Sequence, residues 1–155
     1  MSTLLIHRAH TLATQDDAQT EWRDASVFIR DHRIEWVGPS RDLPPHLQTA
    51  DEVLDARRLL VVPGLVNTHH HMVQSLTRAI PGVQNAELFA WLRGLYPIWA
   101  CLTPEMVQTS TQVAMAELLL SGCTTSSDHL YIYPNGVRLD DSIEAARQIG
   151  MRFVA

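Results

Sequence analysis

After residue 63 the chain alternates between apolar strand-like segments and helical segments, and this alternation limits its fold more than any other feature. Strand-like segments open at Leu65, Cys123 and Met151. Helical patterns lie between them, at residues 85–95, 103–122 and 140–149. Strands that alternate with helices in this way are typical of parallel βα units with crossover connections. We therefore predict an α/β fold for residues 63–155.

Two of the predicted helices carry explicit boundary signals. Thr103 is a suitable N-cap, Pro104 suits the first helical position, and the pattern ends near Gly122. The last helix closes at Gly150, since glycine accepts the left-handed conformation that ends many helices. These signals predict a helix of about five turns, followed by a strand and a second helix.

The first 62 residues have a different pattern and form a separate predicted domain. They read as short antiparallel strands, with a hairpin between 26–30 and 33–37 that turns at Asp31 and His32. Such a turn usually needs positive φ at its second residue, which places that demand on His32. The pattern changes at Pro63 and Gly64, so we divide the chain into residues 1–62 and 63–155.

Composition excludes several classes of function. Twelve basic and seventeen acidic residues give a formal net charge of -5, which leaves no global basic field for nucleic acid or an anionic membrane. All twelve cations are arginine, so a Schiff-base lysine and a phosphate-loop lysine are excluded. Cys101 and Cys123 are too few for a disulfide scaffold, and no apolar stretch approaches a membrane span. We expect a cytoplasmic protein whose partners are small molecules or other proteins.

His69 and His71 are the most informative residues. Alternate residues of a strand face the same side with Cα atoms about 6.5 to 7 Å apart, so two imidazoles at this spacing are able to share one ion. They lie where the predicted strand ends, at the edge where βα folds assemble their sites. His70 should face away, to pack or to make a supporting hydrogen bond. The alternatives are a purification remnant, which would normally be terminal, or a polar strand end without a ligand.

A catalytic zinc site needs three protein ligands, and this chain offers few further donors. Asp128 and His129 end the next predicted parallel strand at the same edge, but we favour a polar strand end for both. The remaining histidines lie in the amino-terminal strands and loops, where surface positions are usual. They are His7, His10, His32 and His46.

Gln74 and a group of aromatic residues are candidates for substrate binding. The Gln74 amide offers donors and an acceptor, which suits a ring with adjacent C=O and N–H groups; the alternative is a solvated loop residue. Trp91, Tyr96 and Trp99 would provide a stacking wall for a flat substrate, although their helix spacing is more typical of core residues.

The segment Pro63-Gly64-Leu65-Val66-Asn67-Thr68-His69-His70-His71 resembles the Pro-Gly and His-x-His signature of the amidohydrolase superfamily. The segments 69–78, 85–92 and 119–129 are similar to those of 8-oxoguanine deaminases and relatives that act on hydroxylated triazines. This resemblance covers essentially the whole chain. Two departures concern turns, since Asp31-His32 and Arg57-Arg58 stand where family members usually have glycine.

The resemblance implies both a fold and a site. It implies that residues 1–62 are the first part of a small β-sandwich and that residues 63–155 are the first βα units of a (β/α)8 TIM-like barrel, incomplete in this chain. It implies that His69 and His71 ligate one divalent metal, zinc or else iron, and that Gln74 contacts the substrate. The remaining ligands and the catalytic carboxylate would lie on later strands, so no catalytic residue is expected within these 155 residues.

The function implied is metal-dependent hydrolytic deamination of a purine-like aromatic heterocycle, as in 8-oxoguanine deaminases, with this chain inactive alone. One alternative is an amidohydrolase that opens a cyclic amide or acts on hydroxylated triazines. Another is a non-catalytic truncated module whose exposed strands at Phe28, Val37 or Phe153 pair with a partner. For the two enzymatic functions the expected partner is a small heterocyclic substrate. We expect binding to neither nucleic acid nor membrane, and a homo-oligomer is possible.

Overall fold

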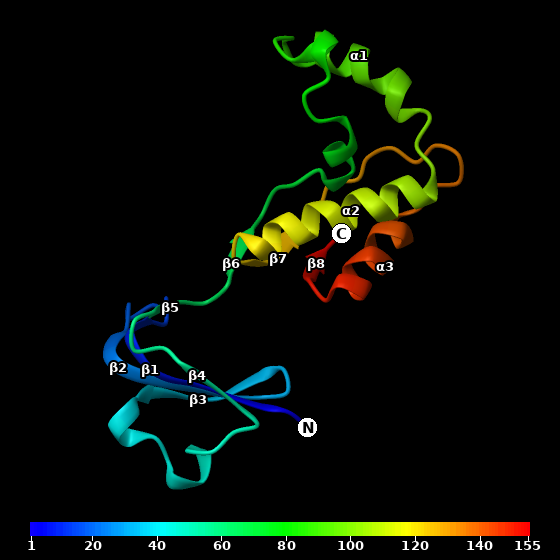
Figure 1. Cartoon of the computed structure of the whole chain (residues 1–155). Helices are drawn as coiled ribbons and strands as arrows, with labels where there is room; N and C mark the ends of the chain where they lie inside the picture. Colours follow the sequence, from blue (N-terminus) through cyan, green and yellow to red (C-terminus); the bar gives the residue numbers. More distant parts are fainter. The chain divides into compact units, whose positions relative to one another are not determined.

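The computed structural model describes all residues from Met1 to Ala155 (Figure 1). Backbone contacts divide the chain into two compact units, Met1–Pro63 and Gly64–Ala155. Each unit has its own sheet, and each is described by itself below.

The amino-terminal unit is a five-stranded sheet in the order β3-β2-β1-β4, with β5 also paired to β1. Antiparallel pairing joins β1 to β2 and β2 to β3. Two short 3-10 turns, Ser40–Asp42 and Pro45–Leu47, separate β3 from β4. The strands are β1 (Thr3–Ala13), β2 (Glu21–Arg30), β3 (Arg33–Pro39), β4 (Glu52–Asp55) and β5 (Leu60–Val61).

Three details of this unit differ from the predictions. Both β4 and β5 pair with β1 in parallel, because the chain crosses back over the sheet between β3 and β4 before it pairs again. The hairpin is where we predicted it, but the positive φ of 54° falls on Asp31 rather than on His32. Phe28 is only 1% exposed on β2, which is paired on both sides, so it is unavailable for pairing with a partner.

The core of this unit lies on both faces of the long β1–β2 pair. One cluster includes Ala9, Leu12 and Val27. The other packs Leu5 and Phe28 against residues of the second 3-10 turn and of the link between the two turns. Side chains alternate between the two faces along a strand. β1 and β2 therefore each contribute residues to both clusters.

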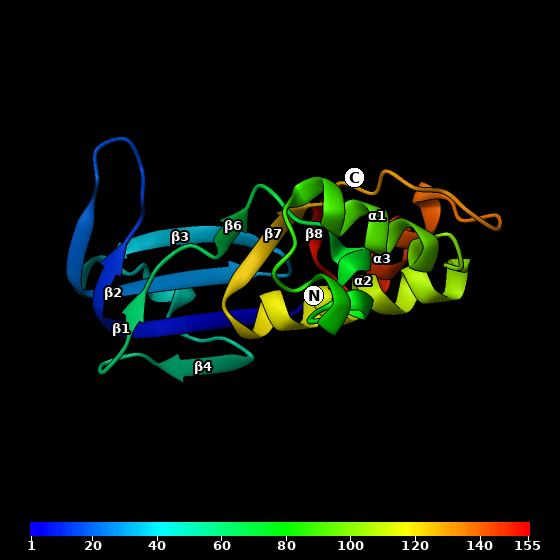
Figure 2. The same ribbon diagram turned by 90° about the horizontal axis from the view of Figure 1, so that it is seen from above.

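The carboxy-terminal unit contains a parallel sheet in the order β6-β7-β8, which confirms the predicted α/β class (Figure 2). α2 packs against α3 and the 3-10 segment η3, and both helices contact the sheet. The elements are β6 (Leu65–Asn67), η3 (Met72–Thr77), η4 (Pro81–Val83), α1 (Leu88–Trp99), α2 (Pro104–Leu120), β7 (Cys123–Ser127), α3 (Leu139–Ile149) and β8 (Arg152–Val154).

The boundaries of α2 and α3 follow the sequence signals closely. The Thr103 side chain accepts a hydrogen bond from the Met106 N–H at 3.3 Å, as an N-cap does. Gly150 closes α3 with a φ of 81°. α1 begins later than predicted and runs on through Pro97 to Trp99, so its last turn tolerates a proline that we had placed beyond its end.

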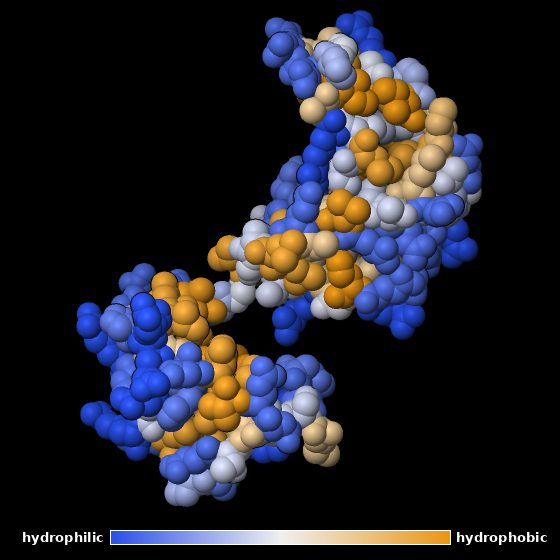
Figure 3. Space-filling view, in the orientation of Figure 1, coloured by the Kyte–Doolittle hydropathy of each residue, from blue (hydrophilic) through white to orange (hydrophobic).

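The core of this unit has two parts. Trp99 and Leu95 are fully buried among residues of α1, η3 and the segment after β7. Met72 and Met115 are fully buried between η3, α2 and α3. Leu65 and Val66 on β6 remain exposed, and apolar surface is visible on the face shown in Figure 3. No helix in the structure combines the length and the apolar character needed to cross a membrane.

Candidate active site

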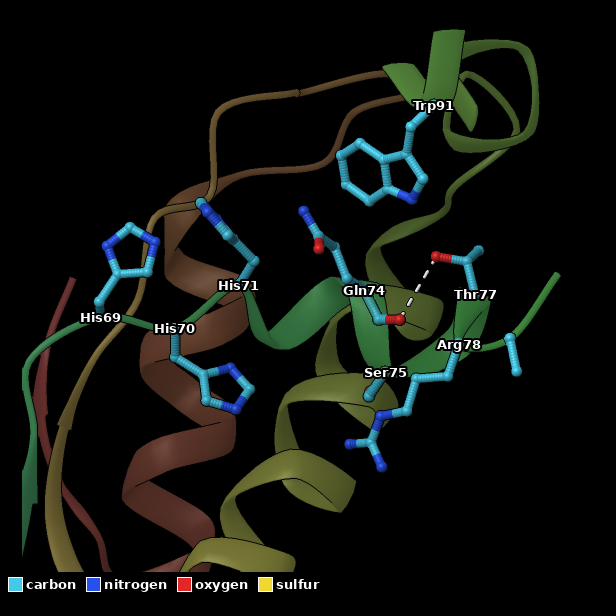
Figure 4. Close-up of a pocket in the computed structure, with 9 residues that line it drawn as sticks. His69, His70, His71, Gln74, Ser75, Thr77, Arg78 and Trp91 are labelled. Carbon is cyan, nitrogen blue, oxygen red and sulfur yellow. Dashed lines mark hydrogen bonds between the residues drawn. The ribbon is translucent and has the colours of Figure 1, made fainter. Parts of the chain in front are cut away.

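The three histidines follow β6 in an irregular segment rather than within the strand. β6 ends at Asn67, whose side chain accepts a hydrogen bond from the His69 N–H at 3.0 Å, and η3 begins at Met72. Strand alternation, our reason for pairing His69 with His71, therefore does not apply here. Figure 4 nevertheless shows both rings on one side of the backbone and the His70 ring on the other.

Three imidazole rings gather at this point. The ring centres of His69 and His71 are 5.0 Å apart, and the His129 ring lies 4.7 Å from the first and 5.6 Å from the second. Two imidazoles that share a tetrahedral zinc ion have centres roughly 5 Å apart, because each bound nitrogen lies about 2.0 Å from the ion. The separation of His69 and His71 is therefore compatible with a shared ion.

The tautomer of His71 follows from one hydrogen bond. Its Nδ1 lies 2.9 Å from the backbone carbonyl oxygen of His129. A carbonyl oxygen only accepts, so Nδ1 carries the hydrogen and the neutral ring keeps its lone pair on Nε2. A backbone carbonyl commonly orients a metal-binding imidazole in this way.

Further hydrogen bonds fasten the histidine segment to the end of β7. The buried Asp128 carboxylate accepts the Met72 N–H through Oδ1 at 2.8 Å, and the His129 N–H donates to the His70 carbonyl at 2.9 Å. Together with the His71 contact, these bonds connect two segments that are distant in sequence. The residues that we expected to form a polar strand end thus also set the path of the histidine segment.

Burial shifts the pKa values of two titratable groups here, His70 in the histidine segment and Asp128 at the end of β7. Desolvation raises the pKa of the Asp128 carboxyl and lowers the pKa of the His70 imidazole, while the charge of each group partly opposes the shift of the other. Asp128 Oδ2 and His70 Nδ1 are both buried without a hydrogen-bond partner. Burial therefore favours the neutral form of both side chains.

A pocket of about 500 Å³ opens beside the histidines (Figure 4). Gln74 lies between His71 and Trp91 in this view, and Arg78 borders the pocket while it holds Glu117 through two hydrogen bonds of 2.9 and 2.6 Å. Its lining residues are His69, His70, His71, Gln74, Ser75, Thr77, Arg78, Ala79 and Trp91.

The aromatic residues divide between core and pocket. Trp99 is fully buried and donates from Nε1 to Thr77 Oγ1 at 3.1 Å, whereas Trp91 lines the pocket and packs edge-to-face on Trp99. Tyr96 also packs edge-to-face on Trp99 and stays 44% exposed. Only Trp91 of the three therefore borders the pocket.

Sequence reasoning missed Tyr131. Its hydroxyl accepts a hydrogen bond from Gln74 Nε2 at 3.0 Å, and its ring packs edge-to-face on His71. Burial raises the pKa of the Tyr131 phenol above its ordinary value of 10.0, so the hydroxyl is protonated throughout the neutral range, as an unperturbed phenol also is. The only available signal was its place soon after Asp128 and His129.

The donor set fits part of a metal site. His69 and His71 provide two imidazoles in the same pocket, and His71 has its Nε2 lone pair available. No group of three or more histidine, cysteine, aspartate or glutamate side chains is arranged to hold an ion in the structure. These residues therefore match two ligands of a catalytic zinc site, which requires at least one more.

Comparison with known proteins places the chain in a family. Residues 60–155 match the model of the amidohydrolase family, and the chain belongs to that family. This segment contains the histidines, Gln74 and both β7 and β8.

Individual relatives include deaminases and related hydrolases. The chain is 55% identical over 100 residues to 8-oxoguanine deaminase of Pseudomonas aeruginosa, covering 63% of this chain and 22% of that protein. It is 37% identical over 167 residues to hydroxydechloroatrazine ethylaminohydrolase of Pseudomonas sp. strain ADP, covering 100% and 34%.

The chain is also similar to solved structures of hydrolases. The zinc complex of atrazine chlorohydrolase from Arthrobacter aurescens TC1 has a TM-score of 0.87 and 29% identity, over 97% of this chain and 34% of that one. The chain thus spans between about a fifth and about a third of the length of these relatives.

Proposed function

We propose that this chain provides the amino-terminal part of a metal-dependent hydrolytic deaminase for a purine-like aromatic heterocycle, of the 8-oxoguanine deaminase kind. The observation that carries the proposal is the pair of imidazoles, with centres 5.0 Å apart, that borders the same pocket as Gln74. The 55% identity to a deaminase of 8-oxoguanine supports the choice of substrate.

In this proposal the fold is the one that the resemblance implies. Residues 1–62 would be part of a β-sandwich, and residues 63–155 would be the first βα units of a (β/α)8 barrel. The structural similarity to a zinc-bound hydrolase, with a TM-score of 0.87, supports it. A cytoplasmic location agrees with two cysteines that make no disulfide.

His69 and His71 would hold one divalent ion, zinc or else iron, through an imidazole nitrogen each. When bound, such an ion supplies Lewis-acid activation of water. Gln74 would bind the polar edge of the heterocycle, and Trp91 would provide a flat apolar wall for its face. Overall, water replaces the exocyclic amine of the ring and ammonia is released.

The test is a chimaera in which this chain replaces the matching segment of the Pseudomonas aeruginosa enzyme. We expect the chimaera to release ammonia from 8-oxoguanine and its His69→Gln variant to lose this activity, while the 155-residue chain alone releases none. A chimaera that folds and binds zinc but releases no ammonia would contradict the proposed deamination. Turnover by the chain alone would contradict its proposed inactivity.

The same chimaera separates the alternative reactions. Ring opening of a cyclic amide, or release of an amine from a hydroxylated triazine without ammonia release from 8-oxoguanine, would favour another amidohydrolase reaction. Assays of the three substrate classes with one preparation give a direct ranking by kcat/KM.

A non-catalytic module is the second candidate because β3 is an edge strand that exposes Val37 to 38%. Sedimentation velocity of the chain tests this reading. A concentration-dependent dimer that Val37→Lys abolishes would favour strand-mediated assembly, and a stable monomer would contradict it.

A further inference from the structure

Tyr131 contacts both the candidate metal ligand and the candidate substrate-binding amide. It lies in the segment after β7, and its hydroxyl accepts the Gln74 Nε2 hydrogen bond at 3.0 Å. Its ring centre lies 5.3 Å from that of His71, with the two planes at 87°. A single side chain therefore bridges the two parts of the site that sequence analysis had identified separately.

Few other hydrogen bonds position Gln74, and one of them joins its backbone N–H to the His71 carbonyl at 3.0 Å. The Gln74 backbone carbonyl accepts a hydrogen bond from Thr77 Oγ1 at 3.3 Å, which fixes the main chain. The only hydrogen bond of its side chain is the one to Tyr131, and Oε1 has no partner. Because the Gln74 side chain is flexible and makes a single hydrogen bond, the Tyr131 hydroxyl sets the orientation of its amide.

The Tyr131 ring is itself supported from the core. It packs edge-to-face on Trp99, with centres 6.1 Å apart and planes at 79°. Trp99 is fully buried and tied to Thr77 by its indole N–H. The anchor of Gln74 is thus backed by a rigid residue.

We propose that Tyr131 is a positioning residue, whose hydroxyl orients the Gln74 amide in the pocket and whose ring orients the His71 imidazole. The effects on heterocycle binding and on metal binding rest on the proposed function. The effect on the Gln74 amide does not.

Two substitutions separate the hydroxyl from the ring. Tyr131→Phe removes only the hydroxyl, so we expect 8-oxoguanine to bind the chain about fivefold more weakly, as for one lost hydrogen bond, with zinc affinity unchanged. Tyr131→Ala also removes the edge-to-face contact with His71, so we expect zinc to bind about threefold to tenfold more weakly as well. Isothermal titration calorimetry measures both dissociation constants. Equal zinc affinity in all three proteins would overturn the role of the ring.

A double-mutant cycle tests whether Tyr131 acts through Gln74. We expect Tyr131→Phe to weaken 8-oxoguanine binding in the wild-type background and to have no further effect in a Gln74→Ala background. An equal effect in both backgrounds would overturn the proposal, because Tyr131 would then contact the heterocycle itself.

The final readout is the proton–nitrogen signal of the Gln74 side-chain amide, recorded on the chain without heterocycle or metal. We expect Tyr131→Phe to shift this signal. Tyr133→Phe is the matched control, because the Tyr133 hydroxyl donates to the Leu130 carbonyl at 2.8 Å and forms no hydrogen bond with His71 or Gln74. An unchanged signal in Tyr131→Phe overturns the proposal. If wild-type chain binds no 8-oxoguanine, the proposed substrate is wrong, and the amide signal alone decides the role of Tyr131.

Discussion

The His71 imidazole donates its Nδ1 hydrogen to the backbone carbonyl of His129 at 2.9 Å. This contact joins the segment after β6 to the segment after β7, and it selects the tautomer whose Nε2 is able to bind a metal. A site at the carboxyl edge of a parallel sheet is thus organised partly by the neighbouring strand, before any ligand is present.

We predict that neutral His71 is the Nδ1–H tautomer. Neutral histidine in water prefers the hydrogen on Nε2, so the carbonyl contact should reverse the usual preference. Long-range proton–nitrogen correlation spectra of the chain distinguish the two tautomers, with the exposed His32 as an internal control. An Nε2–H pattern for His71 would show that the His129 carbonyl does not hold the ring in solution.

We predict that Asp128→Ala destabilises the chain by about 1 to 3 kcal/mol, because it leaves the Met72 N–H without its acceptor in a buried place. Asp128→Asn keeps a carbonyl oxygen at this position and should cost less. Urea unfolding monitored by circular dichroism measures both changes. Equal loss in the two variants would mean that the hydrogen bond contributes little.

The stability contribution of Asp128 should depend on pH. Burial raises its pKa above the ordinary value of 3.8, so the folded chain disfavours the ionised carboxylate. The contribution of the protonated Asp128 carboxyl to the free energy of unfolding is present below pH 3.8 and is lost as pH rises through the raised pKa. As pH rises from below 3.8 through the raised pKa, wild type should therefore lose stability relative to Asp128→Asn. A constant difference across this range would contradict the desolvation of Asp128.

We predict that Gly64→Ala destabilises the carboxy-terminal unit by about 1 to 3 kcal/mol. A Cβ atom at Gly64 would lie 2.6 Å from Thr124 Cγ2 and 2.9 Å from Thr124 Cβ, which is too close for either atom to remain in place. Thr124→Ala should recover part of the loss in the double variant. Gly82→Ala is the control, because nothing lies within 4 Å of its Cβ position. Thermal unfolding that is equal for the Gly64 and Gly82 variants would contradict the close approach.

Local signals predicted the ends of α2 and α3 well. The Thr103 cap and the Gly150 terminator act within one turn of the backbone, and the structure places helix ends at both. The parallel pairing of β4 and β5 with β1 was not predictable in the same way, because strand periodicity identifies faces and not partners.

The site was predicted only in part for the same reason. The histidine motif identified His69 and His71, but the strand ends at Asn67, and a 3-10 segment follows the histidines. His129 and Tyr131 lie beside His71 and Gln74 because the segment after β7 packs against the start of η3. These contacts join residues far apart in sequence, which local patterns do not predict. Their place soon after the end of the next parallel strand was the one available clue.

Zinc titration of the purified chain by calorimetry, with metal analysis of the same sample, tests the central account most directly. We expect one ion per chain, with affinity lowered at least about tenfold by either His69→Gln or His71→Gln and unchanged by His10→Gln. Zinc affinity that survives both site substitutions, or that falls equally with His10→Gln, would contradict a metal site formed by this histidine pair.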